Sequence, residues 1–261
     1  MTGSVRYEVD GAVATITLDR PGARNALTTA AKEELLAALG EAAADSQVRA
    51  VVLTGAGQAF CAGQDLREHA DQLAAGVSPL RTVREHYNPI VMLITTMPKP
   101  VIASLPGVAA GAGASIAFAC DFRIAARRAS LLLAFARIGL SADSGASWTL
   151  QRLVGAARAT ELLMLAEPIS AERALGLGLL TQIVDDDELA GRTAELAGRL
   201  AAGPTAAYAA IKESVLFAAS HDLAAALERE AELQARLGAS ADHQAATTAF
   251  LAKRQPVFEG R

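Results

Sequence analysis

The stretch from Lys99 to Asp121, KPVIASLPGVAAGAGASIAFACD, constrains the fold of this chain more than any other. It predicts a short apolar strand over Val101–Ser104, a turn with glycines at 107, 111 and 113, and then a helix of small residues. Glycine permits positive φ angles and lets a ligand approach the backbone closely. A turn that leads into a helix also presents unpaired N–H groups and the positive end of the helix dipole. The stretch therefore predicts a site for an anion or an oxyanion.

Two other interpretations of this stretch stay open from the residues alone. Residues 100–120 carry no charge, and an uncharged apolar run of about 20 residues is long enough to span a membrane. Pro106-Gly107 and the GAG triplet argue against that, because they interrupt a helix. The second alternative is a buried strand, turn and helix with no chemistry. The glycine spacing GxxxGxG does not match the GxGxxG of nucleotide sites.

Composition limits the classes of function. Of the 261 residues 52% are apolar, which is enough for a substantial core. The net charge of −4 gives no basic surface, so we expect no nucleic-acid partner. Cys61 and Cys120 make no disulfide framework, and no His or Cys spacing suits a metal. Residues 1–10 lack a signal pattern, so we expect a cytoplasmic protein that does not enter a membrane.

Strands alternate with helices along most of the chain, and helices alone follow. Val5–Val9 and Val13–Leu18 are expected to form a hairpin around Asp10-Gly11. Further strands are expected at residues 49–54, 101–104, 122–126, 131–135 and 180–184. Helices are expected at residues 28–44, 79–96, 148–153 and 156–165, with two more after Asp65 and Ser170.

Helix starts and breaks complete the pattern. Thr28, Asp65 and Ser170 are expected to cap the helices that follow them. Residues 186–253 are expected to be helical, with breaks near residues 203, 220 and 239. This pattern predicts an α/β core over residues 1–195 and a C-terminal helical region over residues 196–261.

Six segments of the chain, in order, resemble the crotonase (enoyl-CoA hydratase/isomerase) superfamily. They are DRPGARNALT, FCAGQDL, KPVIASLPGVAAGAGASIAFACDFRIA, IGLSADSGASWTLQRLVG, ISAERALGLGLLTQIV and FLAKRQPVFEGR. The resemblance implies a spiral of ββα turns with C-terminal helices that make homotrimers, commonly paired into homohexamers. It also implies an acyl-CoA substrate, with coenzyme A as part of that substrate and no separate cofactor.

The resemblance also implies where an oxyanion hole lies. In this superfamily two backbone N–H groups stabilise the enolate of a CoA thioester. Carried over by position, these donors fall on Gln64 and Ala112; the alternative is that both are ordinary loop positions. The residues that would line the CoA and acyl groups are Arg24, Ala26, Ala62, Gly63, Gln64, Asp65, Leu66, Gly111, Ser115 and Phe135.

The chain departs from the hydratases of this superfamily at two positions. Those enzymes use two glutamates to place and protonate one water, and the aligned positions here hold Ser115 and Phe135. Neither side chain can act as a general base. We therefore do not expect hydration by a pair of carboxylates, and we expect Ser115 to fill space beside the glycines.

Asp143 is the acid that remains in a position relevant to the superfamily. It aligns with an aspartate of other branches, among them the ring-epoxyphenylacetyl-CoA isomerases of phenylacetate degradation, which the surrounding pattern resembles most. One carboxylate suits proton transfer between two carbons, because the same group removes and returns the proton. Phe135, Ile138 and Leu140 are expected to raise its pKa by excluding water. The alternative is that Asp143 caps the next helix.

We therefore expect an enoyl-CoA or ring-epoxyacyl-CoA isomerase with Asp143 as acid and base. A hydratase with atypical catalytic residues is one alternative, and a non-catalytic acyl-CoA-binding protein is another. The amphipathic segment Leu223–Leu237 is expected at a subunit interface. Lys253-Arg254 is a candidate contact for a CoA phosphate.

Overall fold

The computed structural model describes residues 3–260, so residues 1–2 and residue 261 of the two predicted regions lie outside the described part. The strands within this range are β1 (Val5–Asp10), β2 (Val13–Leu18), β3 (Ala50–Gly55), β4 (Ala59–Cys61), β5 (Val101–Leu105), β6 (Val108–Ala110), β7 (Phe122–Ala126), β8 (Ser130–Leu132), β9 (Ile169–Ser170) and β10 (Gln182–Val184).

Helices alternate with the strands along most of the chain, and within the described range only helices follow β10. They are α1 (Thr29–Ala44), α2 (Leu66–Ala74), α3 (Asn88–Thr96), α4 (Ala112–Ala119), α5 (Ala146–Val154), α6 (Ala156–Leu165), α7 (Ala171–Gly176), α8 (Leu189–Ala201), α9 (Thr205–Ala218), α10 (Leu223–Gly238) and α11 (Ala241–Leu251). Short 3₁₀ turns lie at Pro21–Ala23 and Ala134–Ile138, and a π-helical turn lies at Val83–Tyr87.

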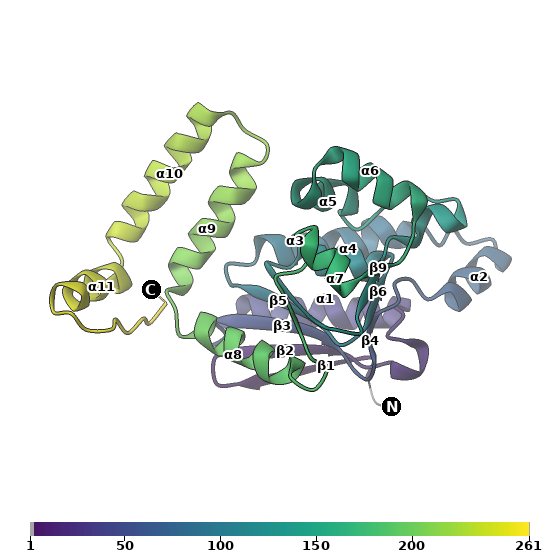
Figure 1. The fold of residues 1–261 in the computed structure, drawn as a ribbon, viewed down its shortest axis with the longest axis horizontal. Coiled ribbons are helices and arrows are strands. Elements are labelled where there is room, and N and C mark those ends of the chain that lie inside the picture. Colours follow the sequence, from purple (N-terminus) through teal and green to yellow (C-terminus); the bar gives the residue numbers. More distant parts are fainter. Residues whose placement is uncertain (1–2, 261) are drawn as a thin grey trace.

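The strands form two sheets that the chain visits in turn. The six-stranded sheet has the order β1-β2-β3-β5-β7-β10 and is parallel except for the β1–β2 hairpin. The four-stranded sheet has the order β4-β6-β8-β9, with β8 and β9 antiparallel. From β3 to β8 successive strands alternate between the sheets, and a helix follows each of the first two pairs directly. The predicted α/β class and the spiral of ββα turns are confirmed (Figure 1).

Local sequence signals placed several elements correctly. The β1–β2 hairpin turns at Gly11, whose φ is +56°, a value that glycine adopts without strain. The Thr28 hydroxyl accepts from the N–H of Ala31 at 3.2 Å and caps α1. Asp65 and Ser170 cap α2 and α7 in the same way. All three predicted caps are confirmed.

Other elements differ from the sequence-based expectation. The strand expected over residues 131–135 ends at Leu132, and Phe135 lies in a 3₁₀ turn. The helix expected from Pro79 contains the π-helical turn at Val83–Tyr87. β4, β6 and β9 were not predicted, because two or three residues are too few to show the alternation that marks a strand.

The uncharged stretch at residues 100–120 is not a membrane helix. It divides into β5, β6 and α4, and α4 has eight residues. No helix within residues 3–260 combines the length and the hydropathy that crossing a membrane requires.

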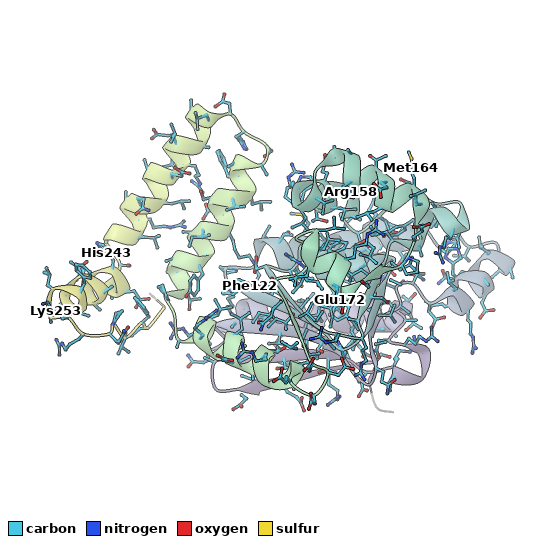
Figure 2. The ribbon with its side chains drawn as sticks, viewed as in Figure 1. Phe122, Arg158, Met164, Glu172, His243 and Lys253 are labelled. Carbon is cyan, nitrogen blue, oxygen red and sulfur yellow. The ribbon has the colours of Figure 1, made fainter. Side chains whose placement is uncertain are left out.

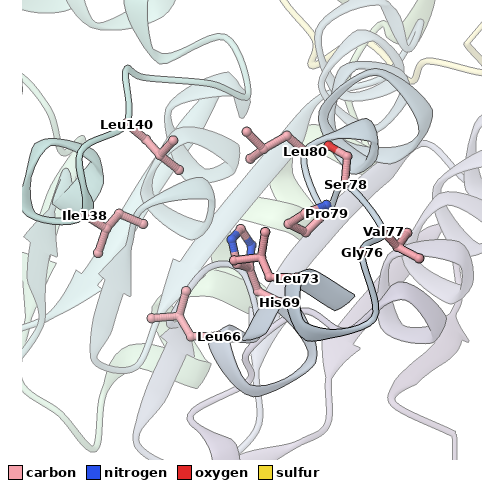
Figure 3. Close-up of a pocket in the computed structure, with 10 residues that line it drawn as sticks. All are labelled: Leu66, His69, Leu73, Gly76, Val77, Ser78, Pro79, Leu80, Ile138 and Leu140. Atoms are coloured by element: carbon pink, nitrogen blue, oxygen red, sulfur yellow. The ribbon is translucent and has the colours of Figure 1, made fainter. Parts of the chain in front are cut away.

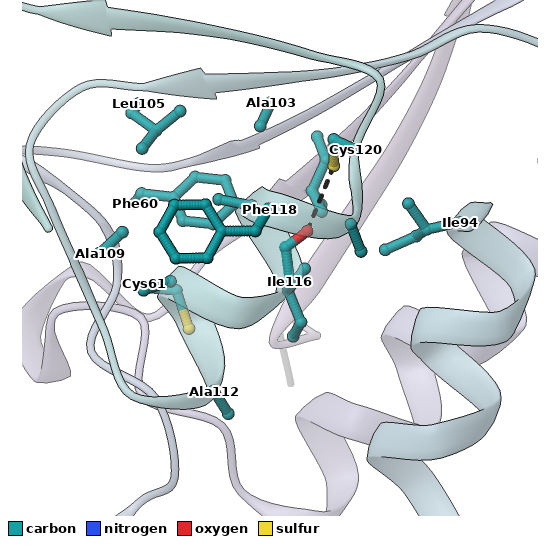
Figure 4. Close-up of a cluster of buried hydrophobic side chains, with 14 of the residues drawn as sticks. Phe60, Cys61, Ile94, Ala103, Leu105, Ala109, Ala112, Ile116, Phe118 and Cys120 are labelled. Carbon is teal, nitrogen blue, oxygen red and sulfur yellow. Dashed lines mark hydrogen bonds between the residues drawn. The ribbon is translucent and has the colours of Figure 1, made fainter. Parts of the chain in front are cut away.

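Apolar side chains cover both faces of the larger sheet. The main cluster lies between the sheets, α1, α3 and α4 and includes Phe60, Leu105 and Ile116 (Figure 4). A smaller cluster on the other face packs α8 against the sheet through side chains such as Ile102 and Leu200. The main cluster fixes α4 against the sheets, and the N-terminus of α4 is part of the site described below.

The last helices leave the sheet core. Figure 1 shows α9, α10 and α11 extending away from the core on one side. These helices carry exposed large apolar side chains: Ile211, Val215, Leu223, Leu227, Phe250 and Leu251. The predicted boundary between residues 195 and 196 lies inside α8, and the division into two regions stays a prediction.

Candidate active site

Two segments far apart in sequence lie side by side at the edge of the smaller sheet. The N–H of Ala62 donates to the Arg24 carbonyl at 2.9 Å, and the N–H of Leu27 donates to the Gly63 carbonyl at 2.8 Å. The Arg20 guanidinium binds the Asp65 carboxylate at 2.9 Å and also donates to the Ala26 carbonyl. The two segments predicted to line coenzyme A are therefore one continuous surface.

Glycines bring the Gln64 loop against the N-terminus of α4. Gly63 has a φ of +87°, and a Cβ at this position would lie 2.7 Å from the Ala110 oxygen and 3.3 Å from the Ala112 nitrogen. A side chain has no room there, so Gly63 is required by this approach as well as by its backbone angle. The loop that presents Gln64 therefore packs directly on the turn that presents Ala112.

The two predicted oxyanion donors are unpaired within residues 3–260. Within residues 3–260, no backbone carbonyl or side chain accepts a hydrogen bond from the N–H of Gln64 or of Ala112. Ala112 is the first residue of α4, where the helix leaves its N–H groups without partners and the dipole is positive. This arrangement suits an oxygen atom that gains negative charge.

Asp143 lies in the loop that leads into α5. Its Oδ1 accepts a hydrogen bond of 2.8 Å from the hydroxyl of Ser144, a buried residue with a φ of +51°. A non-glycine residue in this region is uncommon and is often found at functional sites. The N-cap of α5 is Gly145, and no side chain in the described part of the chain caps this helix. The interpretation of Asp143 as a helix cap is therefore wrong.

Burial sets the protonation behaviour of Asp143. It raises the pKa of the carboxyl above its usual value, while the Ser144 hydrogen bond and the positive charge of Lys32 act in the opposite direction. The direction agrees with the expectation from the sequence. A carboxyl with a raised pKa is a stronger base once ionised, and it is easier to reprotonate near neutral pH.

Lys32 and Tyr87 belong to this site and were missed in the sequence analysis. The Lys32 ammonium donates to the side-chain oxygen of Gln64 at 3.1 Å and to the Thr82 hydroxyl at 2.6 Å. The Tyr87 hydroxyl donates to the same Gln64 oxygen at 2.6 Å. We call Lys32, Gln64, Thr82 and Tyr87 the buried polar cluster. One signal was present: Lys32 precedes Leu35 by three residues and Leu39 by seven, which places it on the buried face of α1.

The charges of this region act on one another. Burial lowers the pKa of Lys32, and the carboxylates of Glu68 and Asp143 partly restore it. Burial also raises the pKa of Tyr87 well above its usual value, and the negative charge of Asp143 adds to that effect. The charge of Asp143 therefore acts on Lys32 and Tyr87, the two residues that hold the side chain of Gln64.

An apolar cavity lies between α2 and the loop before α5. Its volume is about 630 Å³ (Figure 3). Leu66, which was predicted to line the substrate, forms one side, and Ile138 and Leu140 of the loop form another. The remaining lining residues are His69, Leu73, Gly76, Val77, Ser78, Pro79 and Leu80. Such a lining suits an apolar group.

Comparison with known proteins identifies the family. The model of the enoyl-CoA hydratase/isomerase family matches residues 8–261. The chain belongs to this family. It is 46% identical to a Rhodobacter capsulatus protein named "probable enoyl-CoA hydratase", over 99% of this chain and 98% of the relative. It is 40% identical to the 1,2-epoxyphenylacetyl-CoA isomerase of Escherichia coli, over 97% of each chain.

Solved structures of the enoyl-CoA hydratase/isomerase family share the fold. A crystal structure from Mycobacterium abscessus, of a protein assigned as an enoyl-CoA hydratase/isomerase, has a TM-score of 0.94. It is 48% identical, and the match covers 98% of this chain and all of that one. The resemblance seen in the sequence is confirmed at the level of the family.

The two positions that depart from the hydratase pattern are buried. Ser115 has no exposed surface, and its hydroxyl donates to the Gly111 carbonyl at 3.2 Å. This contact fits the expected space-filling role of Ser115. The Phe135 side chain is 7% exposed and belongs to the main apolar cluster. Their roles toward a substrate stay predictions.

Two predicted contacts lie at the surface. Arg24 is exposed on the loop beside Ala62, so its side chain is accessible to an anionic ligand. Lys253 is on the α11 side of the molecule, far from α2 in the view of Figure 2. Within one chain Lys253 is therefore remote from the Gln64 loop. Residues 3–260 contain no group of three or more His, Cys, Asp or Glu side chains arranged to hold a metal.

Proposed function

We propose that this protein is an acyl-CoA isomerase that forms a thioester enolate and moves a proton with Asp143. The observation that carries the proposal is that Asp143, a half-buried carboxylate held by the Ser144 hydroxyl, interacts electrostatically with Lys32, which binds the Gln64 side chain. The positions of the two hydratase glutamates hold Ser115 and Phe135. The nearby carboxylates of Asp65 and Glu68 bind Arg20 and the Thr29 N–H, so Asp143 is the carboxylate that we assign to proton transfer.

In the proposed reaction two N–H groups stabilise the enolate, and one carboxylate first removes a proton and then returns it. The N–H groups of Gln64 and Ala112 bind the thioester oxygen and stabilise its negative charge as the enolate forms. Ionised Asp143 removes a proton from a carbon of the acyl chain, and the electron pair moves into the enolate. Protonated Asp143 then returns the proton to a different carbon, and the thioester carbonyl is restored.

We propose an apolar acyl group that is bulky or cyclic as the substrate class. The cavity of about 630 Å³ is lined mostly by aliphatic side chains from α2, the segment before α3, and the loop at residues 138–140. The 40% identical Escherichia coli relative is named for a ring-containing CoA ester, which supports this class. Arg24, exposed beside the Ala62 segment, is proposed to contact a CoA phosphate.

Hydration is the second candidate, because the 46% identical relative is named as a hydratase. A third outcome is a protein that binds acyl-CoA without turnover. Incubation with a panel of 2-enoyl-, 3-enoyl- and phenylacetyl-type CoA esters, followed by mass spectrometry and NMR, separates the three. An isomer of unchanged mass supports the proposal, a product heavier by one water supports hydration, and tight binding with no product supports the silent binder.

We propose that α9, α10 and α11 form the interface of a homotrimer, alone or paired into a hexamer. Their exposed apolar side chains, such as Ile211, Val215 and Phe250, are too many for an isolated helical arm. Sedimentation equilibrium tests this, and a monomer at micromolar concentration would contradict it. The cytoplasmic location stays a prediction.

A further inference from the structure

The side-chain oxygen of Gln64 accepts two hydrogen bonds from groups that come from different parts of the chain. The Lys32 ammonium of α1 lies 3.1 Å away, and the Tyr87 hydroxyl of the π-helical turn lies 2.6 Å away. An amide oxygen has two lone pairs, so both are used. Because the ammonium and the hydroxyl both donate, they hold the oxygen rather than the nitrogen of the Gln64 amide toward them.

Both donors are buried. Lys32 has no exposed surface, and Tyr87 is 1% exposed. No carboxylate within residues 3–260 lies at salt-bridge distance from the Lys32 ammonium; its hydrogen-bond partners are the oxygens of Gln64 and Thr82. Burying an ammonium group without an ion pair is costly. An apolar side chain at this position of α1 would pack without the cost of a buried charge. Packing therefore does not explain why a lysine is found here.

The π-helical turn orients the rest of the cluster. Thr82 immediately precedes this turn and Tyr87 ends it, five residues later. In an α-helix of 3.6 residues per turn these two positions would point in different directions. The wider π turn, with its i→i+5 bonding, brings them toward the same side. The Thr82 hydroxyl accepts a hydrogen bond from the Lys32 ammonium, and the Tyr87 ring centroid lies 5.3 Å from that ammonium. Such single turns are frequent at functional sites.

We propose that Lys32 and Tyr87 are positioning residues, which hold the Gln64 side chain and thereby aim the Gln64 N–H at the thioester oxygen. This inference rests on the proposed function, because it requires the thioester to bind in the oxyanion hole. The side chain and the N–H belong to one residue on a loop whose preceding Gly63 packs against Ala110. Fixing the side chain therefore leaves the peptide group little freedom to rotate.

The test measures the polarisation of the thioester carbonyl. A saturated acyl-CoA labelled with ¹³C at that carbonyl is bound to the full-length protein, and the infrared stretch is compared with that in water. The variants are Lys32→Met and Tyr87→Phe; the second removes one oxygen and keeps the buried ring. The matched controls are Lys99→Met, which removes a buried lysine that donates to the Ala42 carbonyl, and Tyr7→Phe, whose buried hydroxyl has no hydrogen-bond partner among the described residues.

We expect wild type and both controls to shift the stretch to lower frequency, and both test variants to lose part of this shift. We also expect kcat for α-proton exchange to fall about 10- to 100-fold in the test variants with a smaller change in KM, since the interaction strengthens as negative charge develops on the thioester oxygen. A full shift and an unchanged kcat in folded Tyr87→Phe overturn the inference, whether or not Lys32→Met folds. If wild type itself shows no shift with any ester it binds, the proposed function fails instead, and the inference fails with it.

Discussion

Gly113 lies so close to Cys61 that a Cβ on the glycine would be 2.4 Å from the Cys61 carbonyl oxygen. This contact joins the first turn of α4 to the end of β4, three residues before Gln64. The atom in the way is backbone, so it has little freedom to move aside. The spacing between the Gln64 loop and the N-terminus of α4 therefore depends on the absence of a side chain at position 113.

Gly113→Ala should separate α4 from β4. We expect the free energy of unfolding to fall by about 1–3 kcal/mol, as for other overpacked sites, and turnover to fall because the two N–H donors move apart. Gly40→Ala is the matched control, since Gly40 lies in α1 and a Cβ added there would meet no atom within 4 Å. That control should gain about 0.5–1 kcal/mol. Thermal melts and turnover of Gly113→Ala equal to those of wild type would contradict the account.

The pH dependence of kcat/KM should report the raised pKa of Asp143. The ionised form is the base, so activity is lost as pH falls through a pKa that burial holds above the usual value of about 3.9. Lys32→Met should move this acidic side of the pH–rate profile to still higher pH, because the positive charge of Lys32 lowers the pKa of Asp143. Measuring kcat/KM of wild type and Lys32→Met from about pH 4 upward over roughly four pH units gives the pKa of Asp143 in each protein. An acidic side that stays in place in Lys32→Met would contradict this coupling.

Asp143→Asn should be more stable than wild type at neutral pH. The folded protein raises the pKa of Asp143, so the protonated form is favoured by folding. Wild-type stability is therefore lost as pH rises from the unfolded pKa toward the folded one, and asparagine has no such loss. Thermal melts should show a higher Tm for the variant at pH 7 and a smaller difference near pH 4, about the unfolded pKa. A variant less stable than wild type at pH 7 would indicate that the carboxylate has a structural role.

The apolar cavity should select the acyl group. Leu73→Asp places a charge in the lining, so KM for long or cyclic acyl-CoA esters should rise about tenfold, and KM for a two-carbon ester should change little. Leu175→Asp on α7 is the control, because Leu175 is also an exposed leucine and it does not line the cavity. Equal effects of Leu73→Asp on short and long esters would place the acyl group elsewhere.

The sequence predicted those parts of the fold that local rules or recognised motifs determine. Caps such as Thr28 and the β1–β2 hairpin depend on neighbours in sequence, so they were predicted correctly. The segments around Ala26 and Gly63 were predicted to serve one site through family motifs, and the structure places them side by side. Their chemical roles stay predictions.

The rest depends on contacts between distant residues. The fold brings together Lys32, Gln64 and Tyr87, which span more than 50 residues of chain. The sequence around Lys32 does not indicate which distant residues it contacts. Phe135 was predicted in a strand because its neighbours are apolar, but the chain turns there before reaching the loop of Asp143. The pattern of apolar residues along the sequence does not reveal such a turn.

The most direct test of the central claim is deuterium exchange in D₂O, followed by NMR, with wild type and Asp143→Asn side by side. The account predicts that wild type incorporates deuterium at carbon positions of a bound enoyl- or phenylacetyl-type CoA ester. It predicts a loss of about 10²- to 10⁴-fold in Asp143→Asn, with the dissociation constant of the ester nearly unchanged. Exchange or hydration that proceeds undiminished in Asp143→Asn would contradict the assignment of Asp143 as the base.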